Sequence, residues 1–409
     1  MRLPEAFRAL RYRDFRAFFG AQTIFQIGTW MHSVAQAWLV LSLTNSPLLL
    51  GLINLLHWGP ILLFALPSGV IADRVPKRRL LMATQAALAC TTLTLATLVA
   101  TGMVAYWHVG ILALCAGLAN TLYNVARQSF VIDLVGRDDV VAAVALSSAA
   151  FNGARIVGPA AGGLVIASVG VAPAFAVSSA GYLVVLATLA TLGVEGRSRR
   201  ERPTTIRQDI AEGLAYALRT PEIRAVLGVL FVVSFCAFNF SMWVPLLAKN
   251  VLGQGAQGFG FLMAAVGVGA VAGALTVGTV VPRHPPLALL HASAAAACSV
   301  LLAQSLIESF WLMAVALFLL GYAGVITAAG CNTALQLASS DELQGRVMSL
   351  FTLIHGGCFP IAAFLIGAVS ERWSESTALF VWGAGGLAAL AVLMGARRRP
   401  VVGNRSSAV

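Results

Sequence analysis

The sequence predicts an all-α integral membrane protein with twelve transmembrane helices, on two observations. First, 59% of its 409 residues are hydrophobic and only 11% are charged, whereas about 25% of the residues in a typical soluble domain are charged. Second, the apolar residues gather in segments of about 20 residues or more, the length that a helix needs to cross roughly 30 Å of hydrocarbon. Continuous apolar segments of this length favour helices over a membrane barrel, whose strands alternate apolar and polar residues.

Short polar breaks separate these segments and mark the expected loops. In chain order the expected helices cover residues 16–43, 48–72, 79–101, 106–128, 140–168, 171–194, 224–249, 257–281, 286–306, 310–338, 345–369 and 374–396. The first segment follows a basic tail, as a secretory signal would, but it is too long for one and lacks a convincing small-residue cleavage site. We therefore expect it to be retained as the first helix.

The net charge of +11 comes from basic residues that sit in alternate loops. All 27 Lys and Arg residues except Arg155, Lys249 and Arg372 lie in or beside the N-terminal tail, the loops after even-numbered helices or the C-terminal tail. By the positive-inside rule, this distribution places both termini in the cytoplasm. The same distribution argues against a nucleic-acid partner, because topology alone accounts for the excess positive charge.

A polar, strongly charged stretch divides the chain into two parts. We expect an N-terminal six-helix bundle over residues 1–194, a cytoplasmic linker over 195–223 and a C-terminal six-helix bundle with a short tail over 224–409. Within the linker, apolar residues at helical spacing between positions 206 and 218 suit an amphipathic helix on the membrane surface, and a solvated charged loop explains them equally well. A weak internal repeat, Asn120-Thr121 against Asn332-Thr333, favours two duplicated bundles.

Arg155 is the first candidate for a functional residue, because an ionisable side chain deep in a membrane helix costs about 3 kcal/mol. It could bind an anionic or carbonyl-rich substrate, or it could pair with backbone carbonyls and lock the helices. The first helix offers a second candidate, a polar face at steps of four and three residues. That face holds Gln22, Gln26, Thr29, Ser33 and Gln36, with Trp30 and His32 close by. It could line a substrate cavity or form hydrogen bonds between helices.

Other polar residues in the apolar segments could join such a cavity. They are Asn120 and Asn124 in the fourth segment, Asn239 in the seventh, and Asn332 and Gln336 in the tenth. Asp and Glu residues stay in loops and at helix ends, so a transported proton would need a histidine such as His32, His57, His291 or His355, or a titrating substrate. The sequence contains no phosphate-binding loop and no metal-binding motif, so we expect no enzyme activity, no cofactor and no metal.

Twelve helices in two sets of six, with a charged turn after the second helix, resemble the major facilitator superfamily. The signature of that superfamily at this turn is matched by Gly69, Asp73, Arg74, Lys77, Arg78 and Leu81, and Pro76 replaces its second glycine. Pro76 cannot supply the positive φ that glycine permits, so the turn could differ in shape. The resemblance implies a latch in which Asp73 faces the helix start near Arg346 and the basic residues pair with Asp133, closing the cytoplasmic side of the outward-facing state. The alternative is a topology anchor only.

The fifth segment resembles a motif of the exporters in this superfamily. Ala154, Gly158, Pro159, Gly162 and Gly163 fall on it, with Ala154 in place of the first glycine. Small residues let helices approach closely, so we expect a tight seam, with the eighth helix and its Gly269 and Gly273 as the partner. Generic small-residue packing explains the motif equally well.

Four longer stretches, including residues 10–40 and 343–354, resemble the branch that includes enterobactin exporters and macrolide efflux proteins. The resemblance implies a monomeric proton-coupled antiporter of the bacterial inner membrane that exports a small amphipathic molecule, such as a siderophore or a drug, by rocking its two bundles. An importer of a nutrient or metabolite with the same fold is the first alternative. A membrane sensor or scaffold that binds without transport is the second.

Overall fold

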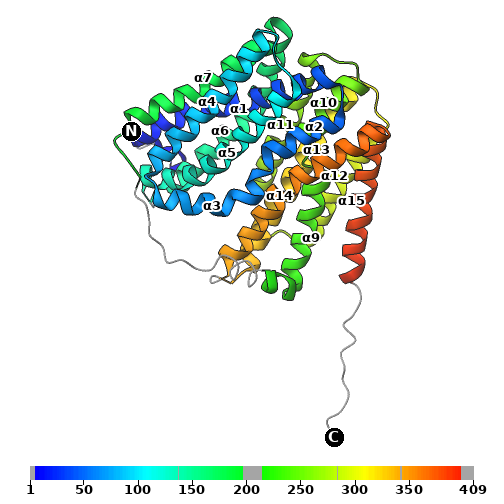
Figure 1. Cartoon of the computed structure of the whole chain (residues 1–409). Coiled ribbons are helices and arrows are strands. Elements are labelled where there is room, and N and C mark those ends of the chain that lie inside the picture. Colours follow the sequence, from blue (N-terminus) through cyan, green and yellow to red (C-terminus); the bar gives the residue numbers. More distant parts are fainter. Residues whose placement is uncertain (1–4, 137, 197–213, 283, 341–342, 398–409) are drawn as a thin grey trace.

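The computed structural model describes residues 5–136, 138–196, 214–282, 284–340 and 343–397, and every regular element in these ranges is helical (Figure 1). Eleven of its helical spans are long and apolar enough to cross a membrane. The twelfth, α1 (Arg13–Thr44), has 32 residues and is less apolar because it carries the polar face predicted above. The all-α membrane fold with twelve spans is therefore confirmed.

The helices of the N-terminal half follow one another with short loops, and one predicted span is broken. In order they are η1 (Glu5–Arg11), α1, α2 (Pro47–Trp58), α3 (Pro60–Arg74), α4 (Lys77–Ala100), α5 (Tyr106–Val135), α6 (Val140–Val169) and α7 (Val171–Thr191). The predicted second helix is in fact two, because Pro60 has no N–H to continue the hydrogen-bond ladder and begins a new helix.

The C-terminal half repeats the arrangement, and its first span is also broken. The elements are α9 (Pro221–Cys236), α10 (Phe240–Leu246), η2 (Leu247–Val251), α11 (Ala256–Thr279), α12 (Leu287–Gln304), α13 (Phe310–Ala338), α14 (Gln344–Arg372) and α15 (Glu375–Arg397). The break lies at residues 237–239, between α9 and α10. Most of the predicted linker lies outside the described residues. Its last part, 214–219, is helical, with Leu214 and Leu218 exposed. The division into two bundles around this linker stays a prediction.

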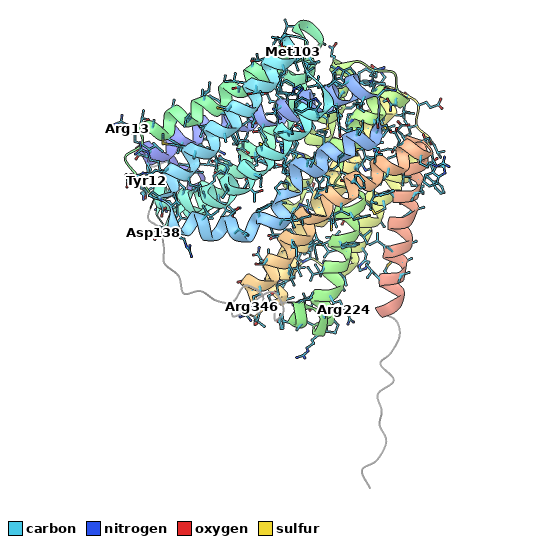
Figure 2. The ribbon with its side chains drawn as sticks, in the orientation of Figure 1. Tyr12, Arg13, Met103, Asp138, Arg224 and Arg346 are labelled. Carbon is cyan, nitrogen blue, oxygen red and sulfur yellow. The ribbon has the colours of Figure 1, made fainter. Side chains whose placement is uncertain are left out.

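Because successive spans run in opposite directions, the loops lie at two opposite faces of the molecule. We call the first the terminal face, which holds the described loop residues 75–76, 138–139, 280–282, 284–286 and 339–340. We call the other the distal face, which holds the turns at 45–46, 101–105, 252–255, 305–309 and 373–374. Figure 2 places Met103 of the distal face far from Tyr12 and Arg13 of the terminal face.

The two halves pack against each other along two seams, α2 with α14 and α6 with α11. Near the distal face these seams are tight: a methyl group on Gly51 would come within 2.7 Å of the Ala363 carbonyl oxygen, and one on Gly367 within 2.5 Å of the Pro47 carbonyl oxygen. Toward the terminal face, α3 and α14 diverge (Figure 1). Arg346, at the start of α14, lies well apart from Asp138 at the start of α6 (Figure 2).

Two polar contacts join the halves at the distal face, and we call them the distal clasp. The carboxylate of Glu371, at the end of α14, accepts hydrogen bonds from the Ser46 hydroxyl at 2.7 Å and the Leu48 amide at 3.3 Å, at the start of α2. The Lys249 ammonium donates to the Leu41 carbonyl oxygen near the end of α1. Each charge therefore meets the helix end of opposite polarity, which stabilises the contact.

Candidate functional site

Arg155 lies near the middle of α6, about 22 Å from the start of the helix at 1.5 Å per residue. Its guanidinium carbon lies 5.8 Å from the ring centre of Trp30 on α1 and 5.1 Å from that of Phe240 on α10. Trp30 belongs to the N-terminal half and Phe240 to the C-terminal half, so the charge sits where the halves meet. Within the described residues, none of the ion pairs includes Arg155.

Aromatic contacts do not neutralise the charge of Arg155, which has no ion-pair partner among the described residues. Cation–π contacts contribute about 0.5–2 kcal/mol each, which offsets part of the cost of a guanidinium at this depth without neutralising it. An anionic or carbonyl-rich group could therefore pair with Arg155 while an aromatic group packs against Trp30 or Phe240. This arrangement suits an amphipathic organic molecule.

The polar face of α1 points into the N-terminal half. Gln22 accepts a 2.6 Å hydrogen bond from the Tyr123 hydroxyl of α5, and His32 Nε2 lies 3.1 Å from Gln36 Oε1. Gln22, Gln26, His32 and Gln36 are all buried. Trp30 also approaches the contact between the halves, through Arg155. A substrate role for this face stays a prediction.

The remaining predicted polar residues are spread over three elements. On α5, Asn124 donates to the Asn120 carbonyl oxygen at 2.9 Å. Asn239 is fully buried in the break before α10 and donates to the Phe235 carbonyl oxygen at 3.0 Å. On α13, Gln336 donates to the Asn332 side-chain oxygen at 2.6 Å. Each of these bonds lies within one span, and Asn120 also lines a small cavity together with Ser33 and Gln36 of α1.

The small residues of α6 form seams with two helices. A methyl group on Gly158 would lie 2.5 Å from the Trp30 Cβ of α1, and one on Gly163 would lie 2.6 Å from the Ala256 carbonyl oxygen of α11. Ala154, Pro159 and Gly162 are also buried, with Gly162 against Met31 of α1 and Pro159 against Gly260 of α11. Packing of α6 on α11 is confirmed, although it uses Gly260 and Gly267. The prediction that Gly269 and Gly273 face α6 is wrong, because both lie against carbonyl oxygens of α13.

The charged turn after α3 binds other parts of the N-terminal half. Lys77 makes a 2.8 Å ion pair with Asp133 of α5. Arg78 donates to the Leu189 and Ala190 carbonyl oxygens at the end of α7, both at 2.6 Å, where a cation is stabilised by the helix dipole. Arg74 is exposed. Gly69 and the Asp73 side chain fall outside the described parts of the chain, and Arg346 begins α14, so the latch across the halves stays a prediction.

Sequence reasoning missed the partners that lie far away in the chain. The contact of Phe240 with Arg155 was not predicted, and neither was the contact of Glu371 with the start of α2. Periodicity identifies a face of one helix, but it does not identify the neighbouring helix that covers this face. A third omission is Asp139, whose side chain is 2% exposed and pairs with Arg11 at 2.6 Å and Arg8 at 3.5 Å. The hydrogen bond to Tyr12, together with Asp139, raises the pKa of Arg11. The basic residues in the N-terminal tail and the acidic residues just before α6 were the sequence features from which these ion pairs could have been predicted.

Comparisons with known proteins agree with this fold. The family described as "Transmembrane secretion effector" matches residues 5–407. The enterobactin exporters EntS of Escherichia coli O1:K1 / APEC and of Shigella boydii serotype 4 are each 26% identical over 390 residues, covering 94% of this chain and 92% of the relative.

Solved transporter structures share the fold at low sequence identity. The nucleoside transporter NupG has a TM-score of 0.73 at 11% identity, covering 95% of this chain and all of that one. A bacterial homologue of the human lysosomal transporter Spinster has a TM-score of 0.66 at 15% identity, covering 95% and 94%. With a match over nearly its whole length, the chain belongs to the transmembrane secretion effector family of the major facilitator superfamily.

Proposed function

We propose that the protein is a proton-driven exporter of a small amphipathic organic molecule, with a siderophore of the enterobactin type as the first substrate to test. The observation that carries the proposal is Arg155, a charge in mid-membrane held between an aromatic ring from each half. Phenolic and carbonyl oxygens of such a molecule could accept hydrogen bonds from the guanidinium while its rings pack on Trp30 and Phe240. The resemblance to enterobactin exporters supports the same substrate class.

Alternating access is the proposed mechanism. The halves meet along the glycine seams and the distal clasp, while α3 and α14 diverge toward the terminal face. If the terminal face is cytoplasmic, as the basic loops predict, this state would load substrate from the cytoplasm. Rocking of the halves would break the clasp, bring Asp73 to the start of α14 and release substrate on the other side. The protein would act as a monomer in the bacterial inner membrane.

Transport in inside-out membrane vesicles tests the proposal. Vesicles containing the wild-type protein should accumulate radiolabelled enterobactin when their interior is acidic, and collapse of the pH gradient should stop accumulation. Arg155→Ala should reduce the initial rate at least about tenfold, the loss expected for a group that positions substrate. Arg224→Ala, which removes an exposed arginine of the terminal face, is the matched control and should keep the wild-type rate.

The two alternatives predict different outcomes. An importer would fill right-side-out vesicles, and cells carrying the gene would accumulate more of the compound than cells without it. A sensor or scaffold would bind the compound with no gradient-driven flux in either orientation. Wild-type rates in Arg155→Ala, at equal amounts of folded protein, would remove Arg155 from the substrate site.

A further inference from the structure

A small cavity lies between α1, α2, α4, α5 and α7 of the N-terminal half, and Ser241 of α10 contributes to its wall. Its volume is about 40 Å³. A water molecule needs roughly 10–15 Å³ of such space, and pockets for organic ligands hold about 300–1,000 Å³. The cavity therefore has room for a few water molecules and for no organic substrate.

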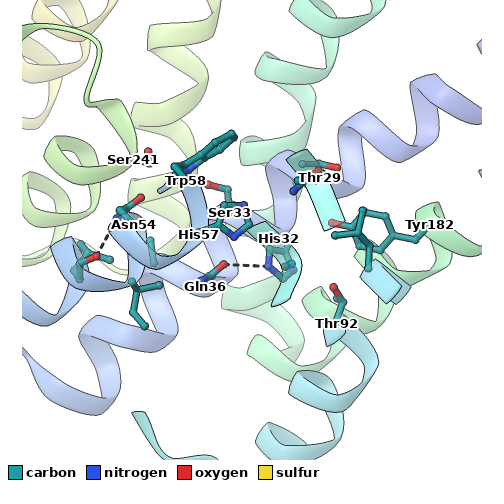
Figure 3. A pocket seen from close by; sticks show the side chains of 16 residues that line it. Thr29, His32, Ser33, Gln36, Asn54, His57, Trp58, Thr92, Tyr182 and Ser241 are labelled. Atoms are coloured by element: carbon teal, nitrogen blue, oxygen red, sulfur yellow. Dashed lines mark hydrogen bonds between the residues drawn. The ribbon is translucent and has the colours of Figure 1, made fainter. Parts of the chain in front are cut away.

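Several polar side chains, two histidines among them, line this cavity. Figure 3 shows His32 and His57 facing the same space, with Thr29, Thr92 and Tyr182 on one side and Asn54, Trp58 and Ser241 on the other. The titratable lining groups are His32 on α1, His57 on α2 and Tyr182 on α7. Among the described residues, none of those that line the cavity from α4, α5 or α10 is titratable, and none of the lining residues is Asp, Glu, Lys or Arg.

Both histidines hold a buried ring nitrogen without a hydrogen-bond partner. His32 Nε2 is engaged with Gln36, but His32 Nδ1 is unpaired, and so is His57 Nδ1. Leaving a buried polar atom unpaired costs about 1–3 kcal/mol, which a water molecule bonded to these nitrogens would relieve. Histidine is also the side chain whose ordinary titration falls between pH 5 and 8.

The backbone holds His57 at a fixed place beside this cavity. A methyl group on Gly117 of α5 would lie only 2.1 Å from the His57 carbonyl oxygen, so α2 and α5 touch directly at this point. His57 is also the second-last residue of α2, next to the break at Gly59 and about 15 Å from the start of the helix at 1.5 Å per residue. The ring is thus positioned deep in the membrane by rigid neighbours.

One wall of the cavity depends on the contact between the halves. Ser241 comes from α10 of the C-terminal half, and the Trp58 ring packs edge-on against Phe359 of α14 at 5.8 Å. Movement of the C-terminal half would therefore remove part of this wall. Access of water to His57 would change with the conformation of the protein, which is what a coupling site requires.

We propose that this cavity is the proton site of the transporter, with His57 as the carrier and His32 as its neighbour in a water-linked pair. The inference rests on the proposed proton-driven export. A proton from water adds to the neutral His57 ring and gives an imidazolium when the wall is open, and it returns to water as the ring becomes neutral again. An imidazolium is costly in the closed cavity, so protonation favours the state in which α10 and α14 have moved.

The test measures conformation and needs no substrate. Spin labels at Met103→Cys and Leu306→Cys, two exposed residues of the distal face on different halves, report distances in purified protein whose six native cysteines are replaced by alanine. In the otherwise wild-type protein, each unit fall in pH between 8 and 5 should raise the ratio of distal-open to distal-closed molecules, by up to about tenfold for one linked proton.

His57→Gln should abolish this pH response, and His32→Gln, which leaves α2 unaltered, should at least halve its slope. His291→Gln is the matched control, because His291 is buried on α12, far in sequence from the cavity, and bonds to the Leu287 carbonyl oxygen. A wild-type slope in His57→Gln, or no pH response in the wild-type protein, would overturn the proposal. If enterobactin is not exported but the pH response is as predicted, the proposed substrate is wrong and the proposed proton site is still supported.

Discussion

Glu371 provides the sharpest test of the distal clasp. Its carboxylate accepts from the Ser46 hydroxyl and the Leu48 amide across the two halves. Hydrogen bonds to a charged group contribute about 1.5–3 kcal/mol and those between neutral groups about 0.5–1.5 kcal/mol. Because Glu371 is exposed, water screens the charge, and we expect Glu371→Gln to destabilise the distal-closed state by about 1 kcal/mol. The open-to-closed ratio should then rise about fivefold.

The distance between spin labels at positions 103 and 306 measures this ratio. Glu375→Gln is the matched control: it removes a carboxylate from the same face, but Glu375 accepts its hydrogen bond from Asn250 within the C-terminal half. An unchanged ratio in Glu371→Gln would refute the reasoning. An equal shift in both variants would show that the net charge of the face, and not the contact between the halves, sets the equilibrium.

Three further predictions follow from the seams and the charged turn. Gly163→Ala should lower the stability by about 1–3 kcal/mol in a thermal unfolding assay, because the added methyl group would push α6 away from α11. Gly153→Ala is the control and should have no effect, because nothing lies within 4 Å of its added methyl group. Asp133→Asn should lower Tm because it weakens the ion pair with Lys77. The expected loss of stability is about 1 kcal/mol, since Asp133 is partly exposed to solvent. An unchanged Tm would contradict this prediction. Asp73→Asn should slow transport while equilibrium binding of substrate stays within about twofold of the wild type, and loss of binding would place Asp73 in the substrate site instead.

The sequence predicted the number and order of the spans because the bilayer imposes a length and an apolar composition on each of them. It did not predict that the second span breaks at Gly59, although Pro60 carried the signal, because the apolar run continues through the break. The break at residues 237–239 carried no comparable proline signal, since Pro245 lies beyond it within α10.

The site was predicted in part, and the difference has a physical reason. Arg155 could be selected from the cost of burying its charge, and the polar face of α1 from its spacing. Which helix covers that face depends on packing between segments far apart in the chain. As a result His32 and Gln36, expected at a substrate cavity, line a water-sized cavity with one wall from the other half. The aromatic partner Phe240 and the clasp at Glu371 could be found only from the packed helices.

The coupling of substrate movement to the proton gradient is the central claim, and one vesicle measurement tests it most directly. Inside-out vesicles with a pH-sensitive dye inside should lose internal protons when the siderophore probe is added, and only when they contain the wild-type protein. His57→Gln vesicles should show no proton loss while still exchanging labelled for unlabelled probe. Proton loss at the wild-type rate in His57→Gln, or gradient-driven accumulation of probe without proton movement in the wild type, would contradict the account.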